Sequence, residues 1–418
     1  MLRVEEAAAR VVADIVPLAV ERVPLREAAG RVLAEDVLSP VTLPHWTNSA
    51  MDGYAVRAAD VRGAREDAPV TLPVLETVAA GAFPTRALAA GEATRIMTGA
   101  PVPEGADSVV RVEDTDGGTT QVRIVRDRDA GKNLRPRGED LHEGQRALAA
   151  GTPIGAAQVG VLASIGQAVV PVHRRPRVAI LGSGDELVDL DRFDEVRAGR
   201  RIVSSNAYTL EALVRANGGE AIPLGHARDT REAMEALLAH AVAARPDLIV
   251  TSAGVSVGAH DHTRAALEAM GAVLDFWKVR MRPGAPIGFG RLAGIPWIGL
   301  PGNPVSAMVT FELFARPVLR RMLGHARLHR RPVPVVLLDP VTLHARLTHF
   351  LRAVVAPGAD GRLTARLTGP QGSGILTSMA QANALLIVPE DPAEVPAGAT
   401  LSALLLTEDA GMADAFAL

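Results

Sequence analysis

The stretch of sequence that decides the fold is residues 178–186, Val-Ala-Ile-Leu-Gly-Ser-Gly-Asp-Glu, in which a short apolar run leads directly into a glycine-rich loop. Two later segments repeat this arrangement. The apolar run 248–251 leads into 252–258, Ser-Ala-Gly-Val-Ser-Val-Gly, and the run 297–300 leads into 301–304, Pro-Gly-Asn-Pro. Each of these runs has the length and composition of a buried strand.

Helical patterns separate these strands. Residues 206–216 and 229–243 have helical spacing, Gly218 is positioned to end the first helix, and 220–224 is another short apolar run. Strands that alternate with helices predict βαβ units. We therefore expect a central three-layer α/β domain with a mostly parallel sheet, at residues 176–328.

The chain before the central domain has a different texture. An amphipathic helix is predicted at 4–15, and short alternating runs broken by Gly and Pro follow from about residue 45 to 140. Within them, the runs 108–113 and 121–125 flank an Asp-Gly-Gly turn, which is typical of a β-hairpin. A helical pattern returns at 153–165. We therefore expect a β-rich domain inserted into a helical region.

The outer boundaries follow from these patterns. The N-terminal region with its insert is expected to span 1–175. After a basic, proline-containing linker, residues 329–418 contain four alternating segments, which predict a small β-barrel or sandwich as the C-terminal domain. These segments are 333–338, 350–355, 362–367 and 384–388.

Composition excludes several classes of function. The 418 residues are 48% hydrophobic, with a formal net charge of −3, which argues against a general nucleic-acid-binding protein. The sequence contains no cysteine, which excludes disulfides, thiolate catalysis and zinc–thiolate or iron–sulfur sites. No apolar run approaches the ~20 residues that span a bilayer. We therefore expect a soluble, cytoplasmic, multidomain protein with no nucleic-acid or membrane partner.

The three glycine-rich loops predict a site for a phosphate-bearing ligand. In open α/β sheets such loops gather at the carboxyl ends of the strands, where glycines let the backbone approach an anion and helix N-termini supply N–H donors. The acids beside the loops have two interpretations. Asp185 and Glu186 either bind a metal ion or ribose, or complement a helix dipole. Asp229 (with Glu232 in a capping box) and Asp261 either cap helices or help to hold Mg²⁺.

Other polar segments leave the choice between a functional and a structural role open. Lys278, Arg280 and Arg282 share one face if this stretch is extended, and they form either an anion-binding wall or a solvated surface. The loop 131–140 concentrates charge among glycines and prolines, and 48–54 is turn-like. Physical reasoning alone assigns these two segments no function.

Seven motifs together resemble one family closely. They are 49–55 (Ser-Ala-Met-Asp-Gly-Tyr-Ala), 96–101 (Ile-Met-Thr-Gly-Ala-Pro), 133–140, 184–187 (Gly-Asp-Glu-Leu), 254–258 with Asp261, 300–307 and 371–374 (Gln-Gly-Ser-Gly). In their order along the chain, they resemble the molybdopterin molybdotransferases of molybdenum cofactor synthesis, the family of MoeA and the gephyrin E domain. The resemblance covers essentially the whole chain.

The resemblance implies a homodimer of elongated subunits, each with a central domain like a molybdopterin adenylyltransferase and a following β-barrel. In the family, the active cleft lies between the central domain of one subunit and the inserted β domain of the other. The implied reaction inserts molybdate into adenylylated molybdopterin and releases AMP, with Mg²⁺ or a similar divalent ion. A molybdopterin adenylyltransferase is the implied functional partner.

Matching each motif position gives the candidate site residues. The candidate catalytic residues are Asp52, Thr98, Arg135, Asp140, Glu186, Asp229, Asp261 and Lys278, of which Asp229 and Asp261 are also the candidate metal ligands. The candidate ligand-binding residues are Ser183, Gly184, Ser252, Gly254, Ser256, Gly258, Pro301, Gly302 and Asn303 in the loops, with Arg282, Arg352 and Ser373. In this assignment, carboxylates with Mg²⁺ polarise the phosphoanhydride, cations stabilise developing charge, and Arg and Ser donors fix the oxyanion.

The chain departs from the family pattern in its central domain. Where the family usually has Lys-Pro-Gly-Lys-Pro, residues 282–286 read Arg-Pro-Gly-Ala-Pro. Arg282 keeps the first charge, but Ala285 loses the second, which belongs to a lysine associated with the oxyanion site. Ala253 also replaces a usual Gly, and Gly182-Ser183 replaces Ser-Thr; we expect both changes to be tolerated.

Three alternative functions stay open. Ala285 favours a paralogue that handles tungstate or another step. A non-catalytic pterin-nucleotide-binding scaffold is the second, although the retained carboxylates argue against it. The third is a bare adenylyltransferase. The flanking domains, with Arg352 and Ser373, argue against it.

Restoring the missing charge tests the family assignment. A lost charge-assisted contact weakens binding by ~1.5–3 kcal/mol, which is more than tenfold. Ala285→Lys is therefore expected to lower the molybdate concentration that gives half-maximal AMP release. An unchanged half-maximal concentration would contradict this assignment.

Overall fold

The apolar run of residues 178–181 forms strand β12 (Arg177–Ser183) in the computed structural model, which describes residues 1–254, 262–343, 345–391 and 393–407. Side chains of this strand alternate between two cores. Val178 and Ile180 belong to one hydrophobic cluster, and Ala179 and Leu181 belong to another. A strand buried on both faces requires helices on both sides of its sheet.

The central sheet has six strands in the order β15-β12-β16-β20-β19-β17. Strands β15, β12, β16 and β20 are parallel, and β19 runs antiparallel to both of its neighbours. The expected mostly parallel sheet is thus confirmed. The bounds of the other five strands are β15 (Glu220–Ala227), β16 (Leu248–Ser252), β17 (Val273–Lys278), β19 (Pro286–Leu292) and β20 (Ile295–Leu300).

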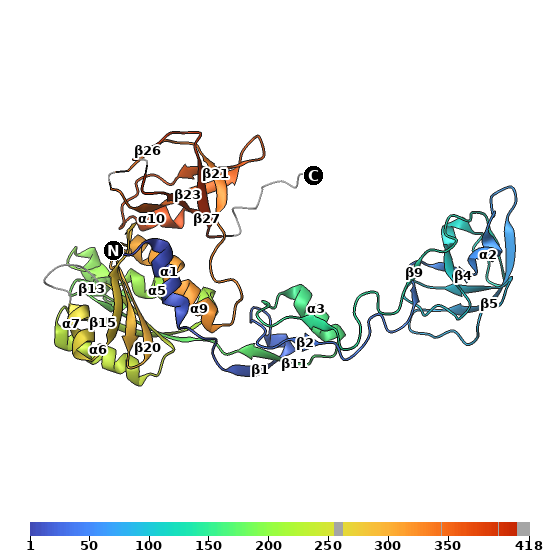
Figure 1. Cartoon of the computed structure of the whole chain (residues 1–418), viewed down its shortest axis with the longest axis horizontal. Helices are drawn as coiled ribbons and strands as arrows, with labels where there is room; N and C mark the ends of the chain where they lie inside the picture. Colours follow the sequence, from blue (N-terminus) through green and yellow to red (C-terminus); the bar gives the residue numbers. More distant parts are fainter. Residues whose placement is uncertain (255–261, 344, 392, 408–418) are drawn as a thin grey trace. The chain divides into compact units, whose positions relative to one another are not determined.

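Helices cover both faces of this sheet (Figure 1). One face packs against α1 (Val4–Ala13), α5 (Ser205–Ala216), α8 (Pro304–Thr310), the π-helical turn Phe311–Ala315 and α9 (Arg316–Met322). The other packs against α6 (Arg231–Ala243) and α7 (His262–Ala269). This is the expected three-layer arrangement. Within the described ranges, the helices are too short or too polar to cross a membrane.

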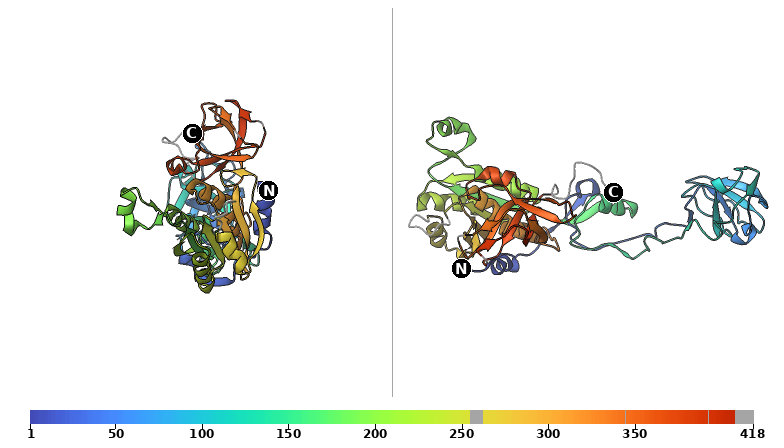
Figure 2. Two further views of the ribbon diagram at one scale, coloured as in Figure 1. Left: turned by 90° about the vertical axis from the view of Figure 1, so that its left-hand side faces the viewer. Right: turned by 90° about the horizontal axis from the view of Figure 1, so that it is seen from above.

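A small arm interrupts the first βα connection. It contains β13 (Leu187–Val188), the 3-10 turn Leu190–Arg192, α4 (Phe193–Arg197) and β14 (Ile202–Val203), with β13 and β14 paired in parallel. Figure 2 shows the arm projecting from the body of the central domain. It lies between the loop that ends β12 and the start of α5, so its base borders the carboxyl edge of the sheet.

The C-terminal strands close into a barrel. The order β23-β24-β21-β27-β25 is completed by a β23–β25 pairing, and the short β18 adds to β23. The expected β-barrel is confirmed. Its elements are β18 (Met281–Arg282), β21 (Val333–Leu337), β23 (Thr348–Pro357), β24 (Leu363–Leu367), α10 (Leu376–Ala380), β25 (Ala384–Val388) and β27 (Thr400–Leu405), with β22 (Val341–Thr342) paired to β26 (Glu394–Val395).

Contacts between residues divide the chain into two units. Unit 1 comprises Met1–Ala34, Gly151–Gly155 and Val169–Leu418, and it includes the β1 (Val20–Pro24) and β11 (Val169–His173) pair, the central domain and the barrel. Unit 2 comprises Glu35–Ala150 and Ala156–Ala168.

Unit 2 is built around a five-stranded sheet in the order β7-β4-β6-β5-β8. Its strands are β4 (Gly53–Val56), β5 (Val70–Val78), β6 (Ala93–Ile96), β7 (Ser108–Arg111) and β8 (Gln121–Ile124). Two short pairs join β2 (Val37–Leu38) to β10 (Arg146–Leu148) and β3 (Asn48–Ser49) to β9 (Leu134–Arg135), and the helices are α2 (Ala58–Val61) and α3 (Ala156–Ser164).

The predicted hairpin in this unit is wrong. Strands β7 and β8 both form, but β7 pairs with β4 and β8 pairs with β5, so they occupy opposite edges of the sheet. Only the short stretches next to the turn face each other, where Thr115 bridges Ile124. The local turn signal was correct, but pairing with β4 and β5, which are distant along the chain, decides where the two strands lie.

Candidate functional site

The three predicted loops surround one cavity of about 690 Å³ at the carboxyl ends of β12, β16 and β20. The predicted residues that line it are Ser183, Glu186, Ser252, Gly254, Pro301, Gly302 and Asn303. Residues 203–207, around the start of α5, form another wall, so the first turn of a 12-residue helix borders the cavity. Gly184 lies between two lining residues. The predicted Ser256, Gly258 and Asp261 fall outside the described residues.

Asn206 ties two of these loops together, a role that sequence reasoning missed. Its Nδ2 donates to Ser252 Oγ at 2.6 Å and to the Gly302 carbonyl at 2.8 Å. Its Oδ1 is enclosed and has no hydrogen-bond partner among the described residues. Asn206 was interpreted only as the start of a helix, and no spacing rule links it to residues 46 and 96 positions away.

The loop after β16 is held in a conformation that favours glycine. Gly254 has φ = 70°, and a Cβ there would lie 1.8 Å from Thr263 Oγ1. Ala253, which precedes it, has φ = 74°. An L-residue in this left-handed region costs about 1–2 kcal/mol. The replacement of a usual Gly by Ala253, expected to be tolerated, therefore has a conformational cost at the cavity wall.

Asp185 and Asp229 face each other across the ends of two neighbouring strands. Asp229 Oδ2 accepts from the Asp185 N–H at 3.3 Å, and Asp185 Oδ1 accepts from the Asp229 N–H at 3.4 Å. The N-cap interpretation of Asp229 is wrong, because Thr230 caps α6 and its Oγ1 accepts from Ala233 N at 3.2 Å. Asp229 is thus positioned beside the loop that ends β12.

Asp185 and Asp229 place two carboxylates close to each other. In the described ranges, no three acidic or histidine side chains gather closely enough to cage an ion. Mg²⁺, however, usually takes only one or two carboxylates and completes its shell with water and substrate phosphates. Asp229 with Asp185 beside it fits that limited requirement, and the second predicted ligand, Asp261, lies outside the described residues.

Burial alternates along residues 278–282. Lys278 and Arg282 are exposed and Arg280 is half-buried, while the residues between them, Val279 and Met281, are buried. Lys278 lies opposite Pro286 in the β17–β19 register, and Pro286 lines the cavity.

The middle cation, Arg280, forms an ion pair with Glu390 of the C-terminal domain. It donates from Nε and Nη2 to the two Glu390 carboxylate oxygens, at 3.1 and 2.6 Å. These hydrogen bonds hold the pKa of Glu390 below its usual value. Of the three cations, this leaves Lys278 and Arg282 as the candidates for binding an anion.

The barrel reaches the cavity through one loop. Gly374 lines the cavity, and the predicted Ser373 precedes it. The Ser373 carbonyl accepts from Val305 N in α8 at 3.1 Å. Arg352, on β23, is fully buried; it is not a lining residue, and its guanidinium donates to residues of this loop and to Ser378.

In unit 2, the predicted Asp52 and Thr98 are in direct contact. Asp52 Oδ1 accepts from both the N–H and the Oγ1 hydroxyl of Thr98, each at 2.7 Å. These two hydrogen bonds, led by the backbone N–H, hold the pKa of the exposed Asp52 below its usual value. Asp52 is therefore a carboxylate whose oxygen is fixed in place by its neighbour.

The predicted Arg135 and Asp140 line a second cavity, of about 490 Å³, within unit 2. Asn48, another lining residue, lies opposite Arg135 in the β3–β9 pair. Asn48 is only 7% exposed, and its Oδ1 has no hydrogen-bond partner among the described residues. A backbone hydrogen bond links the segment that carries Asp52 to the segment that carries Arg135, because Ala50 N donates to the Asn133 carbonyl at 2.9 Å.

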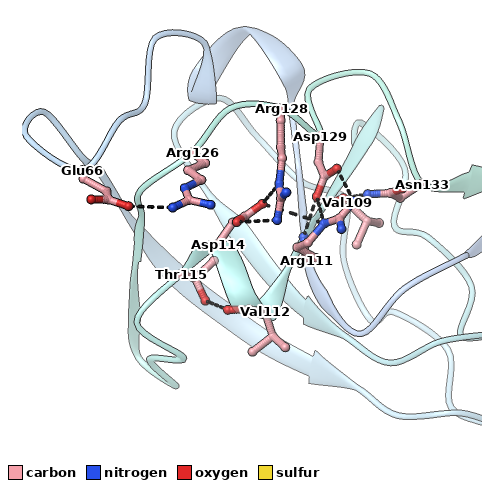
Figure 3. A network of polar contacts seen from close by, with 10 residues as sticks. All are labelled: Glu66, Val109, Arg111, Val112, Asp114, Thr115, Arg126, Arg128, Asp129 and Asn133. Atoms are coloured by element: carbon pink, nitrogen blue, oxygen red, sulfur yellow. Dashed lines mark hydrogen bonds and ion pairs between the residues drawn. The ribbon is translucent and has the colours of Figure 1, made fainter.

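An ion pair between the half-buried Arg111 and the buried Asp129 holds the loop that carries Arg135 (Figure 3). Asp129, 2% exposed, accepts from Arg111 Nε at 2.8 Å, Nη2 at 3.0 Å and backbone N at 3.2 Å. Asn133, at φ = 65°, donates from Nδ2 to the Val109 carbonyl at 2.8 Å. Burial alone raises the pKa of Asp129, but the Arg111 and Asn133 hydrogen bonds outweigh it, so the pKa lies below its usual value.

Asp129→Asn tests this anchor. The amide keeps one acceptor and turns N–H groups toward a guanidinium, so we expect unit 2 to lose about 2–3 kcal/mol of unfolding free energy in urea at pH 7. Asp67→Asn is the control, because Asp67 forms an exposed pair with Arg65 and should cost less than about 0.5 kcal/mol.

The difference in unfolding free energy between the wild type and Asp129→Asn should decrease as the pH falls. A lowered pKa in the folded state means that the stabilisation is complete above the unfolded carboxylate pKa of about 3.9. It should then disappear as the pH falls through the lower folded-state pKa. Equal losses in both variants at pH 7 would contradict the anchoring role of Asp129.

Ala253→Gly tests the strain at the cavity wall. Glycine relieves the left-handed conformation but adds freedom to the unfolded chain, so we expect a gain of about 1 kcal/mol or slightly less in unfolding free energy. Ala212→Gly, at an exposed position inside α5, should instead cost about 0.5–1 kcal/mol. A loss of stability in both variants would show that Ala253 is not strained.

Three family models match the chain in order. Residues 2–166 match the MoeA N-terminal region (domain I and II), residues 179–321 match a probable molybdopterin binding domain, and residues 334–406 match the MoeA C-terminal region (domain IV).

Relatives with assigned names match over nearly the same length. Molybdopterin molybdenumtransferase 2 of Mycobacterium tuberculosis is 41% identical over 92% of this chain and 95% of its own. Molybdopterin molybdenumtransferase of Nostoc sp. is 39% identical, over 88% of this chain and 85% of its own. The crystal structure of the molybdopterin biosynthesis moeA protein from Pyrococcus horikoshii OT3 superposes with a TM-score of 0.83 at 30% identity, over 97% of this chain and all of that one. The chain belongs to the MoeA family.

Proposed function

We propose that the chain is a molybdopterin molybdenumtransferase, which inserts molybdate into adenylylated molybdopterin and releases AMP. The observation that carries this proposal is the cavity at the carboxyl edge of the central sheet, bordered by three glycine-rich loops and the first turn of α5. Loop glycines and helix N-terminal N–H groups are the usual binding elements for phosphate. The cavity therefore suits the phosphates of a pterin nucleotide.

Asp229, with Asp185 beside it, is proposed to hold Mg²⁺ together with Asp261. The ion would neutralise and polarise the phosphoanhydride oxygens of the substrate. The mutual hydrogen bonds of Asp185 and Asp229 support this role, because they hold Asp229 beside the loop that contributes Ser183 and Glu186 to the cavity wall. Glu186, which lines the cavity, is proposed to orient the nucleotide.

Lys278 and Arg282 are proposed to stabilise the negative charge that develops as AMP leaves. Their exposure on one face supports this role, as does the Lys278 position opposite a lining residue. Ser373 is proposed as a donor to the molybdate oxyanion. Ala285 offers no charge there, so weak molybdate affinity is part of the proposal.

We further propose a cytoplasmic homodimer in which Asp52, Thr98, Arg135 and Asp140 of one subunit act on the substrate held by the central domain of the other. Each of these residues belongs to unit 2, where Thr98 fixes the Asp52 carboxylate, and where Arg135 and Asp140 border an open cavity. A molybdopterin adenylyltransferase is proposed to supply the substrate. The division of the chain at about residues 175 and 328 belongs to the same proposal.

The names of the relatives favour this function over the alternatives. Each relative described above is named for the molybdenumtransferase activity or for molybdopterin biosynthesis. A bare adenylyltransferase does not account for a chain that also matches the family's N-terminal and C-terminal regions. The retained carboxylates Asp52, Glu186 and Asp229 argue against a scaffold.

The direct test measures AMP released from adenylylated molybdopterin by the purified chain with Mg²⁺, titrated with molybdate and, in parallel, with tungstate. We expect release that depends on molybdate. Asp229→Asn should lower kcat by about 10²-fold, because it removes a charge at the reacting phosphates. Asp194→Asn is the matched control, since Asp194 is 96% exposed on the arm.

Two outcomes would overturn the proposal. Binding of adenylylated molybdopterin without oxyanion-dependent AMP release would indicate a scaffold. Release that depends on tungstate but not on molybdate would indicate the paralogue.

A further inference from the structure

The arm that follows β12 supplies part of the cavity wall, although its outer part is not held by apolar burial. Leu187, Ile202 and Val203, from its two short strands, line the cavity. The 3-10 turn Leu190–Arg192 and α4, in contrast, have no buried residue. Burial of apolar surface is the main force that offsets the entropy of ordering a segment. The position of the arm therefore depends largely on polar contacts at its base.

The first of these contacts joins the returning strand of the arm to the loop that ends β12. Arg201 Nη1 donates to the Asp185 carbonyl. The next backbone N–H along the chain, that of Ile202, donates to the Glu186 carbonyl at 2.9 Å. Two consecutive residues of the arm thus bind the carbonyl groups of the two acids at the end of this loop.

The second contact joins the arm to α5. Tyr208, in the first turn of α5, donates from its hydroxyl to Asp189 Oδ1, and Leu190 N donates to the same oxygen at 2.7 Å. These two hydrogen bonds, led by that of the hydroxyl, hold the pKa of Asp189 below its usual value. Asp189 is therefore a charged acceptor at neutral pH, which strengthens both hydrogen bonds.

Both contacts act on the cavity indirectly. Neither the arginine nor the tyrosine side chain is a lining residue. Their partners, Asp185 and Asp189, flank the lining residues Glu186 and Leu187. The two contacts therefore influence the cavity only through the loop and the arm.

We infer that Arg201 and Tyr208 are positioning residues, which hold the arm against the loop that ends β12 and so keep Glu186, Leu187 and Ile202 in the wall of the nucleotide cavity. We call these two side chains the arm clamp. That the ligand is a nucleotide rests on the proposed function.

Two variants each remove one donor of the arm clamp and keep most of the side chain. Arg201→Met removes the guanidinium, and Tyr208→Phe removes only the hydroxyl. Arg200→Met is the matched control, because Arg200 is the exposed neighbour of Arg201. All three are made in the full chain.

The first measurement is amide hydrogen exchange, which needs no ligand. Ile202 N and Ser204 N donate to the carbonyls of Glu186 and Val188, so they report whether the arm is held. Loss of one hydrogen bond corresponds to about threefold to tenfold, and both clamp variants should accelerate exchange of these two amides by that factor. The control should leave it unchanged. Unchanged exchange in both clamp variants would overturn the inference, whether or not the chain is a transferase.

The second measurement compares AMP with adenosine, each titrated into the full chain with Mg²⁺. A clamp that acts through the cavity wall affects both ligands alike, so each clamp variant should raise the Kd of AMP and of adenosine by one common factor of about three to ten. Arg201→Lys keeps a donor for the Asp185 carbonyl and should restore both affinities.

Two outcomes of this titration would overturn the inference. Weaker binding of AMP with unchanged binding of adenosine would indicate that the clamp residue contacts the phosphate directly. Unchanged Kd values for both ligands in both clamp variants would indicate that the arm does not shape the cavity. If the wild type binds neither ligand, the nucleotide assignment of the proposed function fails, and the exchange experiment still decides whether the clamp holds the arm.

Discussion

The parallel alignment of β12, β16 and β20 is the constraint on which the rest of the site depends. Because these strands run in one direction and in register, the loops that follow them open at the same edge of the sheet. Residues separated by more than a hundred positions, such as Ser183 and Gly302, therefore line one cavity. Asn206 then fixes the spacing of two loops with a single amide group.

The molecule uses buried polar groups where its glycine-rich loops need support. Arg352 holds the loop at the barrel, and the Arg111–Asp129 pair holds the loop before Arg135 in unit 2. Such groups add little net stability compared with an apolar core. Their geometry is directional, however, so they can fix a loop that has few side chains to pack. Ala253, in contrast, destabilises its loop locally, because a residue other than glycine takes a left-handed conformation at the cavity wall.

Periodicity and loop composition were enough to predict the four parallel strands β15, β12, β16 and β20, the helices between them, and a C-terminal barrel or sandwich, because each rests on local patterns that burial reinforces. They did not predict β17 and β19, which complete the central sheet. The hairpin at 108–125 could not be predicted correctly, since long-range pairing with β4 and β5 decides where its strands lie. The capping of α6 turned on one residue, with Thr230 preferred to Asp229.

The site was predicted only in part, for a related reason. Seven predicted residues line the cavity because they lie at the carboxyl ends of strands or just after them, and this position can be recognised in the sequence. The partners of Asn206 and Arg352 are mostly backbone carbonyls contributed by distant loops. A carbonyl group has no sequence signature, so these positioning contacts become visible only in three dimensions.

The measurement that tests the central claim most directly is a crystal structure of the full chain with AMP and Mg²⁺. Our account predicts AMP in the unit 1 cavity, with its phosphate against the first turn of α5 and the loop that ends β12. AMP bound elsewhere on the chain, with this cavity empty at saturating nucleotide, would contradict the account.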